Sequence, residues 1–493
     1  MTSEVNLPSY YRVLETPEFD STSIGVKVHK LDCSNNNQSG LNNSQVKTFK
    51  YVGDQKCIRL HPFLSGFRVR AGFKTQTHAG TDESTANITL ANNWFWHLWS
   101  QYKLKVANKS DLESISNIGE FTDIMTHFRG DELKRMEGQL NGFIRDEGSG
   151  LAVDIPIVAT NPVVTAGAAT AANFVTISNN ANYNRGYHKR KNLYNYACAD
   201  ADIREIEQFF PLFFSGFFNT DTCLMNTSFE IELTRKAGTD FKNAIFGADT
   251  TDIIFGTGET ELLSVTLELY EQIPEKIRVE PSLLSVFGNT NKEPKPLAYL
   301  KASCQRIAWG ESDKYTISET SYHVPRFVFI GIKGADKIAT PVVDNSANTE
   351  KKATGNYSLW SHANIQSIKV SINGQQFPAD EQDAKFLKNQ FSIFYQSYVD
   401  TCRSLPYGGS VSLDMNEFKD LYPIFAFNCE NQEPKISTNT TNLKVELKRR
   451  AKPADNTNRK DPQVLEIFMV VLEDQYAVID AVRNTCNVYS KPV

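Results

Sequence analysis

Three tryptophans lie within six residues of the chain, in the stretch LANNWFWHLWSQYKLKV (90–106). Trp94, Trp96 and Trp99 are three of the five tryptophans in the protein. Indole rings can cage a ligand, anchor a chain at a membrane surface, stack on nucleic-acid bases or fill a buried packing joint. A base-stacking platform needs interleaved basic residues, and only two lysines follow closely. The cluster therefore favours a buried joint or an interface between subunits.

The cysteines and histidines are dispersed, and none has the spacing of a metal site. The chain has eight of each, with no CxxC pair and no HExxH motif. We therefore expect neither a metal ion nor a cofactor. The first 20 residues lack a basic start followed by an apolar run, so we expect no secretory signal and eight free thiols. These are Cys33, Cys57, Cys198, Cys223, Cys304, Cys402, Cys429 and Cys486.

Motifs for enzyme chemistry are absent from the sequence: there is no nucleophile elbow, P-loop or dinucleotide fingerprint. The acidic pairs Asp131–Glu132 and Glu473–Asp474 lie in contexts that predict solvated side chains. The basic runs HKRK (188–191) and KRRAK (448–452) could contact nucleic acid or an acidic neighbour, but a solvated loop is the favoured interpretation. We therefore predict no catalytic residues and no enzyme.

Two further features bear on partners. Residues 129–131 spell Arg-Gly-Asp, a tripeptide that some integrin ligands use, but a three-residue word occurs often by chance. The alternative is a turn in which Asp131 caps a helix that begins at Glu132. The net charge of −5 argues against a protein whose main task is to neutralise phosphate. No stretch approaches the roughly 18 uninterrupted apolar residues of a membrane span.

The elements that must position these residues are mainly short β-strands. Alternation of apolar and polar residues predicts half-buried strands. The segments with this alternation are 65–74, 229–235, 263–270 and 367–373. Two further segments are apolar almost throughout, which predicts strands covered on both faces. They are FVFIGI (327–332) and VLEIFMVVL (464–472). Helices are predicted at 132–144 and 383–405.

The strands that are apolar on both faces predict a neighbour outside the barrel. A barrel interior takes one face of each strand, so the other face of Phe327, Phe329 and Phe468 needs a sister barrel or a second subunit. We expect these residues to lie at packing joints or interfaces. The tryptophans Trp94, Trp96, Trp99 and Trp360 are candidates for the same role. Such an excess of apolar surface predicts an obligate oligomer of closed symmetry, since obligate interfaces commonly bury more than about 2,000 Å².

Five segments recur in the same order in the two halves of the chain. NTSFEIELTRKA (226–237) matches TTNLKVELKRRA (440–451) without a gap, at an offset of 440 − 226 = 214 residues. The other pairs are PLFF (211–214) with PIFA (423–426), LLSVTLELYEQ (262–272) with VLEIFMVVLEDQ (464–475), WSQYKLKVAN (99–108) with WSHANIQSIKVSIN (360–373), and FRVRAGFK (67–74) with RFVFIGIK (326–333). A single match could be chance, but the ordered set predicts two copies of one β fold.

The repeats divide the chain into parts. The predicted parts are an N-terminal arm (1–45), a first copy (46–285), a second copy (286–480) and a C-terminal tail (481–493). The boundary between copies is placed in 279–296, which is rich in Pro, Asn and Lys. The first copy carries a large insert at 148–187 and the second a polar insert at 333–356, and both are predicted to be loop towers on the outer face.

Taken in order, these segments resemble the double jelly-roll major capsid proteins of the Polinton/Maverick, adintovirus and hexon-like group, over about residues 60–480. The elements that carry the resemblance are NNWFWHLWSQYKLKVAN (92–108), GYHKRKNLY (186–194), FFPLFFSGFF (209–218), FEIELTRK (229–236), RVEPSLL (278–284), HVPRFVFIGI (323–332), SIKVSINGQQFP (367–378) and YPIFAFN (422–428). In one departure, where relatives often have His in the first element, this chain has Trp96 with His97 beside it.

The resemblance implies a mainly β protein of two tandem eight-stranded jelly rolls, with few helices and long surface loops. It implies a major capsid protein of an icosahedral double-stranded DNA virus or virus-like element, located in the virion and assembled inside the host cell. Expected partners are two further copies in a trimer, neighbouring capsomers, and penton and minor capsid proteins, with nucleic acid contacted at most indirectly. Two alternatives stay open. Clustered His and Glu would support a bicupin-like enzyme or binding protein, and genomic context would reveal a domesticated host copy.

Overall fold

The structure, a computed structural model, describes twenty-three stretches of the chain. They are residues 23–33, 41, 46–53, 57–73, 88–107, 109–128, 142–148, 184–194, 204–220, 222–236, 245–247, 253–254, 260–274, 294–310, 312–321, 324–334, 350–351, 356–378, 383–406, 411–431, 441–450, 465–480 and 483–489. The Arg-Gly-Asp tripeptide and most of both inserts lie outside these residues.

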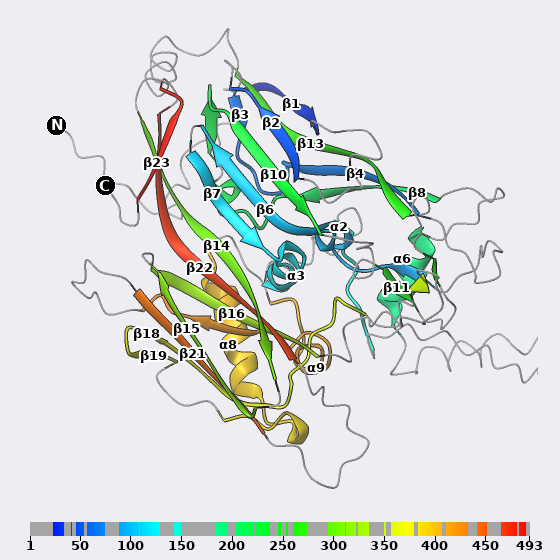
Figure 1. The fold of residues 1–493 in the computed structure, drawn as a ribbon, viewed down its shortest axis with the longest axis vertical. Helices are drawn as coiled ribbons and strands as arrows, with labels where there is room; N and C mark the ends of the chain where they lie inside the picture. Colours follow the sequence, from blue (N-terminus) through cyan, green and yellow to red (C-terminus); the bar gives the residue numbers. More distant parts are fainter. Residues whose placement is uncertain are drawn as a thin grey trace, which may run out of the picture.

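The first half of the chain folds as two facing β-sheets (Figure 1). One sheet consists of β8 (Arg204–Pro211), β4 (Gly66–Phe73), β13 (Thr260–Pro274), β3 (Cys57–Arg59) and β9 (Cys223–Met225), with β1 (Ser23–Asp32) also paired to β13. The other consists of β2 (Val46–Tyr51), β10 (Phe229–Arg235), β6 (Trp99–Val106) and β7 (Lys109–Ser116). Alternation along β10 buries Phe229, Ile231 and Leu233 against the facing sheet, as the sequence pattern requires.

The second half repeats this arrangement. One sheet consists of β14 (Lys295–Trp309), β22 (Leu465–Asp480), β16 (Pro325–Gly334) and β20 (Phe425–Asn428), with β23 (Thr485–Tyr489) also paired to β22. The other consists of β15 (Lys314–Ser321), β21 (Thr441–Arg449), β18 (Ile365–Ile372) and β19 (Gln375–Phe377). Two short pairs complete the described strands: β11 (Ile245–Gly247) with β5 (Ile88–Leu90), and β12 (Ile253–Ile254) with β17 (Glu350–Lys351).

Of the strands that the structure describes, eight in each half follow one topology. In chain order these are β1, β2, β4, β6, β7, β8, β10 and β13, and then β14, β15, β16, β18, β19, β20, β21 and β22. In both halves the first, eighth, third and sixth strands form one sheet, and the second, seventh, fourth and fifth form the other. This is the jelly-roll order. The predicted fold of two tandem eight-stranded jelly rolls is confirmed.

Four of the five pairs of repeated segments occupy equivalent strands, whereas PLFF (211–214) lies at the end of β8 and PIFA (423–426) at the start of β20. The gap-free pair falls on β10 and β21, which are the seventh strand of each copy. The pair 99–108 and 360–373 falls on β6 and β18, which are the fourth strand of each copy. The pair 262–272 and 464–475 falls on β13 and β22, which are the eighth strand. Equivalent strands have the same two neighbours and the same buried face, so the same alternation of residues serves both copies.

The structure differs from the predicted parts at both ends. Strand β1 lies within the segment 1–45 expected as an arm, and β23 lies within the segment 481–493 expected as a tail. Both pair with the eighth strand of their own copy, which is 15 residues long in β13 and 16 in β22. For β1 this is the pairing of the first strand with the eighth, whereas β23 is a further strand that the long β22 accepts on its other edge. Most of the expected boundary, residues 279–293, lies outside the described residues.

The helices are less well predicted than the strands. The described helices are α2 (Trp94–His97), α3 (Ile118–Phe128), α6 (Arg185–Tyr194), α8 (Ser392–Ser404) and α9 (Met415–Asp420), with short 3-10 turns η2 (Phe218–Thr220) and η4 (Phe386–Lys388). The predicted helix at 383–405 begins only at Ser392, because Asn389 has a φ of 55° and ends η4 before it. The predicted helix at 132–144 lies almost wholly outside the described residues.

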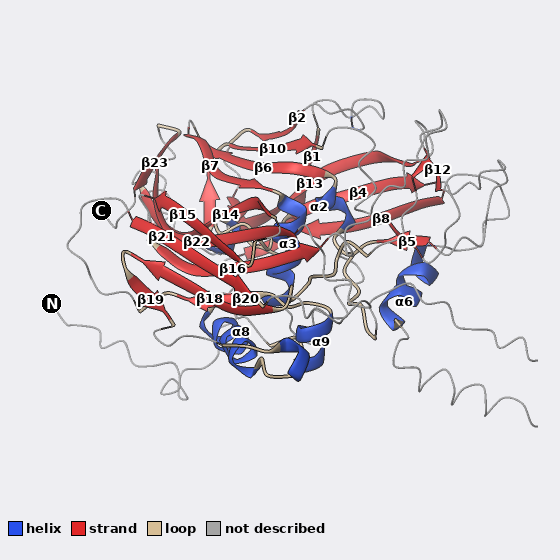
Figure 2. Cartoon of the chain, turned by 60° about the horizontal axis from the view of Figure 1, so that its bottom comes forward, coloured by secondary structure: helices blue, strands red, loops and turns tan. Residues whose placement is uncertain are grey.

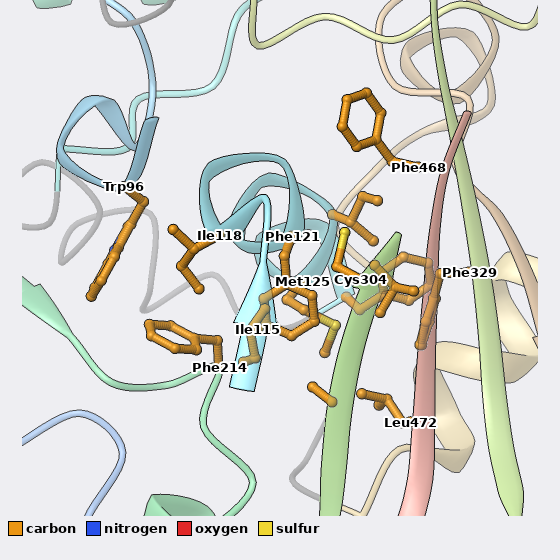
Figure 3. Close-up of a cluster of buried hydrophobic side chains, with 14 of the residues drawn as sticks. Trp96, Ile115, Ile118, Phe121, Met125, Phe214, Cys304, Phe329, Phe468 and Leu472 are labelled. Atoms are coloured by element: carbon orange, nitrogen blue, oxygen red, sulfur yellow. The ribbon is translucent and has the colours of Figure 1, made fainter. Parts of the chain in front are cut away.

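Helix α3 occupies the joint between the two jelly rolls (Figure 1). Ten of its 11 residues are buried, on the apolar stripe of Ile118, Phe121, Ile124, Met125 and Phe128 and also on the opposite face, which carries Glu120, Asp123 and His127. Figure 3 shows Phe121 and Met125 of α3 directed toward Cys304, Phe329 and Leu472 of the second half. Helices α8 and α9 lie together along one side of the second jelly roll (Figure 2).

The strands predicted to be covered on both faces are covered within one chain. Phe327, Phe329 and Phe468 are each no more than 1% exposed. The ring of Phe329 lies 4.6 Å from Phe128 of α3, and Phe128 lies 5.1 Å from Tyr398 of α8. The apolar surface that predicted a second subunit is therefore covered within the chain, at the joint between the two copies.

The cysteines within the described side chains yield the first prediction. Cys33, Cys304, Cys402, Cys429 and Cys486 are buried and form no disulfide bond. Burial raises the pKa of the Cys402 and Cys429 thiols to about 12, which suppresses the reactive thiolate. We expect a thiol label to add eight groups to the denatured chain but to leave these five unlabelled in the folded chain. Intact mass under non-reducing conditions measures this, and six or fewer additions after denaturation would reveal a disulfide.

Candidate functional site

The tryptophan cluster is a buried joint at one end of the first jelly roll. Trp94, Trp96 and Trp99 are 0%, 1% and 0% exposed. The Trp94 Nε1–H donates a hydrogen bond of 2.6 Å to Gln208 Oε1 on β8. The Trp96 ring stands edge-on to Phe214, with ring centres 4.8 Å apart. Neighbouring side chains of the same chain therefore fill the space around these rings that a ligand cage would need to leave open.

A tight contact between α2 and α3 fixes this cluster. A Cβ atom at Gly119 would lie 2.3 Å from Nδ1 and 2.8 Å from Cα of His97, so only glycine fits at this position. Asn93, immediately before α2, has a φ of 54° and donates a 3.0 Å hydrogen bond from Nδ2 to Asp123 Oδ1 of α3. The sequence NNWFWH thus folds locally as a turn docked on the helix of the joint.

Trp360 occupies the corresponding corner of the second jelly roll, just before β18. It is fully buried and stands edge-on to Phe468, with ring centres 5.9 Å apart. The Lys333 Nζ atom lies 4.2 Å from the centre of the Trp360 ring. In the first jelly roll the guanidinium of Arg235 lies 5.5 Å from the Trp99 ring. Each copy therefore places a cation over the tryptophan that leads its fourth strand.

A cluster of buried charges, which we call the α3 charge cluster, crosses the joint. Its members are His97, Glu120, Asp123 and Lys236 from the first half and Lys333 and Tyr357 from the second. His97 Nε2 lies 3.0 Å and Lys333 Nζ 3.9 Å from Asp123 Oδ2. The Tyr357 hydroxyl donates a 2.5 Å hydrogen bond to Glu120 Oε1, which also lies 3.6 Å from Lys236 Nζ.

The pKa values in the α3 charge cluster reflect competition between burial and charge. Burial alone would raise the pKa of the Glu120 carboxyl, but the charges of Lys236, His97 and Lys333 and the Tyr357 hydrogen bond lower it to about 2. Burial lowers the pKa of Lys333 to about 8, against the opposing pull of Asp123 and Glu120. The cluster therefore keeps the Glu120 carboxyl ionised. It also lowers the pKa of Lys333 far enough that the amine begins to lose its proton near neutral pH.

A second buried network centres on the Asp146 carboxylate, and we call it the Asp146 hub. Arg190 Nη2 donates to Oδ1 at 2.6 Å, and both side chains are 0% exposed. The other donors to the carboxylate are Asn184 Nδ2 at 2.8 Å, Asn356 Nδ2 at 2.9 Å, Asn92 Nδ2 at 3.3 Å and the Tyr422 hydroxyl at 3.3 Å. Asn356 and Tyr422 belong to the second half, so one carboxylate binds side chains of both jelly rolls.

The Asp146 hub corrects the predicted limits of the two inserts. Asn184 and Tyr187 are fully buried, although 148–187 was expected to be a surface excursion throughout. In the insert expected at 333–356, both end residues, Lys333 and Asn356, are also buried. The roots of both inserts belong to the interior because their polar side chains satisfy buried charges at the joint. The middle of each insert lies outside the described residues apart from Glu350–Lys351.

The predicted solvated loops are also partly wrong. The run HKRK lies in α6, and its Arg190 is buried on Asp146. In KRRAK, Arg449 closes β21 with its guanidinium 5.1 Å from the Trp309 ring, and Arg450 pairs with Asp383 at 2.7 Å. The acidic residue Asp474 lies on β22 and accepts hydrogen bonds from Arg326 Nε at 2.8 and 2.9 Å. Each of these charges has a partner in the chain, which a single sequence cannot show.

A third buried carboxylate, Glu113 on β7, lies where β7 packs on β14. The Ser215 hydroxyl donates to it at 2.5 Å and the Phe217 N–H at 2.8 Å. Burial raises the pKa of Glu113 to about 7, although both hydrogen bonds and the charge of Lys301 on β14 oppose the rise. Because the pKa lies above the ordinary 4.5, folding favours the protonated form.

Glu113 yields a prediction of pH dependence. The contribution of Glu113 to the free energy of unfolding is complete below pH 4.5. It falls by a total of about 3 kcal/mol as the pH rises through 7. Burial lowers the pKa of His127 to about 3, so the contribution of His127 to stability rises as the pH increases from 3 to 6.5. The Glu113→Gln variant isolates Glu113. We expect the variant to gain stability relative to the parent chain between pH 4.5 and 7 in urea unfolding, and a constant difference would contradict this.

Within the part of the chain that the structure describes, no group of three or more His, Cys, Asp or Glu side chains is arranged to hold a metal ion. In the same part, no helix is long and apolar enough to cross a membrane. The polar side chains brought together there, notably Glu113, Glu120, Asp123, Asp146 and Arg190, join elements to one another. Of these, only Arg190 was singled out from the sequence, within HKRK (188–191), and it was expected to be solvated; the others have no motif around them.

Comparison with known proteins agrees with this architecture. Residues 311–460 match the family described as double jelly roll-like domain. No curated protein matches the chain in sequence. Among solved structures, the chain is similar to one from the cryo-EM structure of the Sputnik virophage, with a TM-score of 0.58, 12% identity, and coverage of 99% of this chain and 91% of that one.

Two further structures are similar over nearly their whole length. The mavirus major capsid protein gives a TM-score of 0.53 at 12% identity, covering 99% of this chain and 96% of that one. The Faustovirus major capsid protein gives a TM-score of 0.50 at 9% identity, covering 94% and 92%. At these identities the likeness defines the fold. The chain has the double jelly-roll fold seen in these viral major capsid proteins, as the sequence resemblance predicted.

Proposed function

We propose that this chain is the major capsid protein of an icosahedral double-stranded DNA virus or virus-like element. The observation that carries the proposal is the extent of the structural likeness: 99% of the chain is covered by the match to the mavirus major capsid protein, including both jelly rolls and the joint between them. A single jelly roll occurs in proteins of many functions, but two in tandem along a whole chain fit a shell subunit far better than an enzyme.

The tandem arrangement suits a shell tile. Two closed β units of the same topology stand side by side in one chain (Figure 1), so three chains supply six similar units. Six units tile a hexagonal lattice, and closed β units offer flat sides with few free strand edges. We propose a homotrimer with a pseudo-sixfold outline, located in the virion and assembled inside the host cell. Its partners are neighbouring capsomers and penton and minor capsid proteins.

The buried polar groups of the joint support a structural role. The Asp146 hub and the α3 charge cluster both connect the two jelly rolls, and all their side chains except Lys236 are buried. Such networks cost desolvation and fix one relative orientation of the parts that they join. A fixed orientation is what a tile in a regular shell requires. We propose that the chain has no enzymatic role.

The trimer is tested by the mass of the particle in solution. Light scattering coupled to size exclusion is expected to return three times the chain mass of 55.5 kDa, unchanged on dilution to micromolar concentration. Negative-stain images are expected to show particles with a triangular or hexagonal outline. A stable, folded monomer under these conditions would overturn the proposed capsomer.

A further inference from the structure

One contact in the α3 charge cluster joins a primary amine to a carboxylate inside the protein. Lys333, near the end of β16, is 0% exposed, and its Nζ atom lies 3.9 Å from Oδ2 of Asp123 on α3. Asp123 is 2% exposed. The two residues lie 333 − 123 = 210 positions apart and belong to different jelly rolls. Their side chains meet beside α3, and Figure 3 shows buried apolar side chains of the same helix.

The groups around the pair hold both reactants in place. The Lys333 ammonium donates to the Tyr357 carbonyl and lies 4.0 Å from the Tyr357 ring centre. Asp123 Oδ1 accepts a hydrogen bond from Asn93 Nδ2 at 3.0 Å. Asp123 Oδ2 lies 3.0 Å from His97 Nε2, yet neither this oxygen nor either His97 ring nitrogen has an aligned hydrogen bond. The carboxyl thus has one oxygen held by an amide donor and the other facing the amine and an imidazole.

We propose that Lys333 and Asp123 form an intramolecular amide bond that ties the two jelly rolls together covalently. The Nζ lone pair attacks Cγ of Asp123, and the bond from Cγ to Oδ2 breaks. Oδ2 leaves as water with two of the three protons of the ammonium, one of them passed through His97 Nε2. The third proton remains on the amide nitrogen. An ammonium and a carboxylate thus become an amide and water, without an oxidant, a reductant or any other reactant.

The surroundings favour this condensation over an ordinary ion pair. Attack requires a neutral amine, and burial lowers the pKa of Lys333 to about 8, so a fraction of the amine is neutral near pH 7. The Asn93 amide stabilises the oxygen on which charge develops, and fixed positions replace a chance encounter. Forming the bond also removes two buried charges, whose desolvation is costly. The burial of both side chains disfavours hydrolysis of the product.

The intact mass of the full-length chain tests the proposal independently of any capsid role. After purification, incubation at pH 8 and denaturation with a reductant, the chain is expected to be lighter than its sequence mass by one water. Trypsin is expected not to cleave after Lys333 and to release a branched peptide that contains Lys333 and Asp123. A chain of full sequence mass that is cleaved after Lys333 overturns the proposal, whatever the behaviour of the variants.

Variants identify the two partners. Lys333→Arg keeps a cation but lacks the primary amine, so its mass is expected to equal its sequence mass. Asp123→Asn can still react, with ammonia as the leaving group, and is expected to be lighter by one ammonia. Asp123→Ala should show no loss. If Lys333→Arg still loses one water, the dehydration lies elsewhere in the chain, for instance in a succinimide, and the cross-link is refuted. His97→Gln is expected to slow the mass loss over time without abolishing it.

Discussion

Asp146→Ala is expected to lower the free energy of unfolding by about 3–5 kcal/mol, because it leaves the buried Arg190 guanidinium without its counter-charge. The same change removes the acceptor for Asn184 from the first half and for Asn356 from the second. Both jelly rolls lose contacts at their joint, so the loss should appear as one lower transition midpoint. Urea unfolding followed by circular dichroism measures it.

The neighbouring residue provides a matched control. Glu147 pairs with Arg185 at 3.7 Å, but these side chains are 42% and 63% exposed. Glu147→Ala is therefore expected to cost less than about 1 kcal/mol. The double variant Asp146→Leu with Arg190→Met removes both charges and should be more stable than Asp146→Ala. Equal effects of Asp146→Ala and Glu147→Ala would mean that the Asp146 hub contributes nothing beyond a surface ion pair.

Trp96→Ala is expected to cost about 3–5 kcal/mol, since it removes a large buried side chain from a tightly packed site. The Trp96 ring contacts Phe67 on β4, Phe95 on α2 and Phe214 after β8, with ring centres 5.8, 5.0 and 4.8 Å apart. These elements meet beside α3, as Figure 3 shows for Trp96, Ile118 and Phe214. The resulting cavity should lower the urea midpoint, and Trp96→Phe should lower it less.

An exposed aromatic residue serves as the comparison for Trp96. Tyr489 on β23 is 38% exposed, and Tyr489→Ala should cost less than about 1 kcal/mol. If Trp96→Ala is no more destabilising than Tyr489→Ala, the tryptophan cluster is not a packing joint. The cluster would then have to be reconsidered as a binding surface, one of the alternatives that its composition alone leaves open.

The strands and the duplication are predictable from sequence because both are local. Alternation along FEIELTR (229–235) depends only on which face of one strand is buried, and β10 has the predicted alternation. The gap-free match between 226–237 and 440–451 requires equivalent positions in two copies, and β10 and β21 occupy them. Helix α3 was not among the predicted helices although its apolar and polar residues alternate at helical spacing, and only the structure shows that both of its faces are buried.

The Asp146 hub could not be predicted because its members are distant in sequence. Asp146 and Arg190 are 44 residues apart, and Asn356 is 210 residues from Asp146. Isolated Asp, Arg and Asn residues are ordinary on a solvated surface, and only the packing of one jelly roll on the other takes them out of water. The same holds for Lys333, whose place at the edge of a polar insert predicted exposure.

The sequence by itself determined the β character, the repeat and the family resemblance, since these depend on spacing along the chain. Only the tertiary structure shows what covers the strands that are apolar on both faces. The cover is helix α3 and the packing of the two jelly rolls within one chain. The tertiary structure also decided which charges are buried, because burial depends on where distant segments meet. The apolar run FVFIGI (327–332) is enough to predict that Phe329 lies at a packing joint or interface. Its contact with Phe128, 201 residues earlier in the sequence, exists only in the folded molecule.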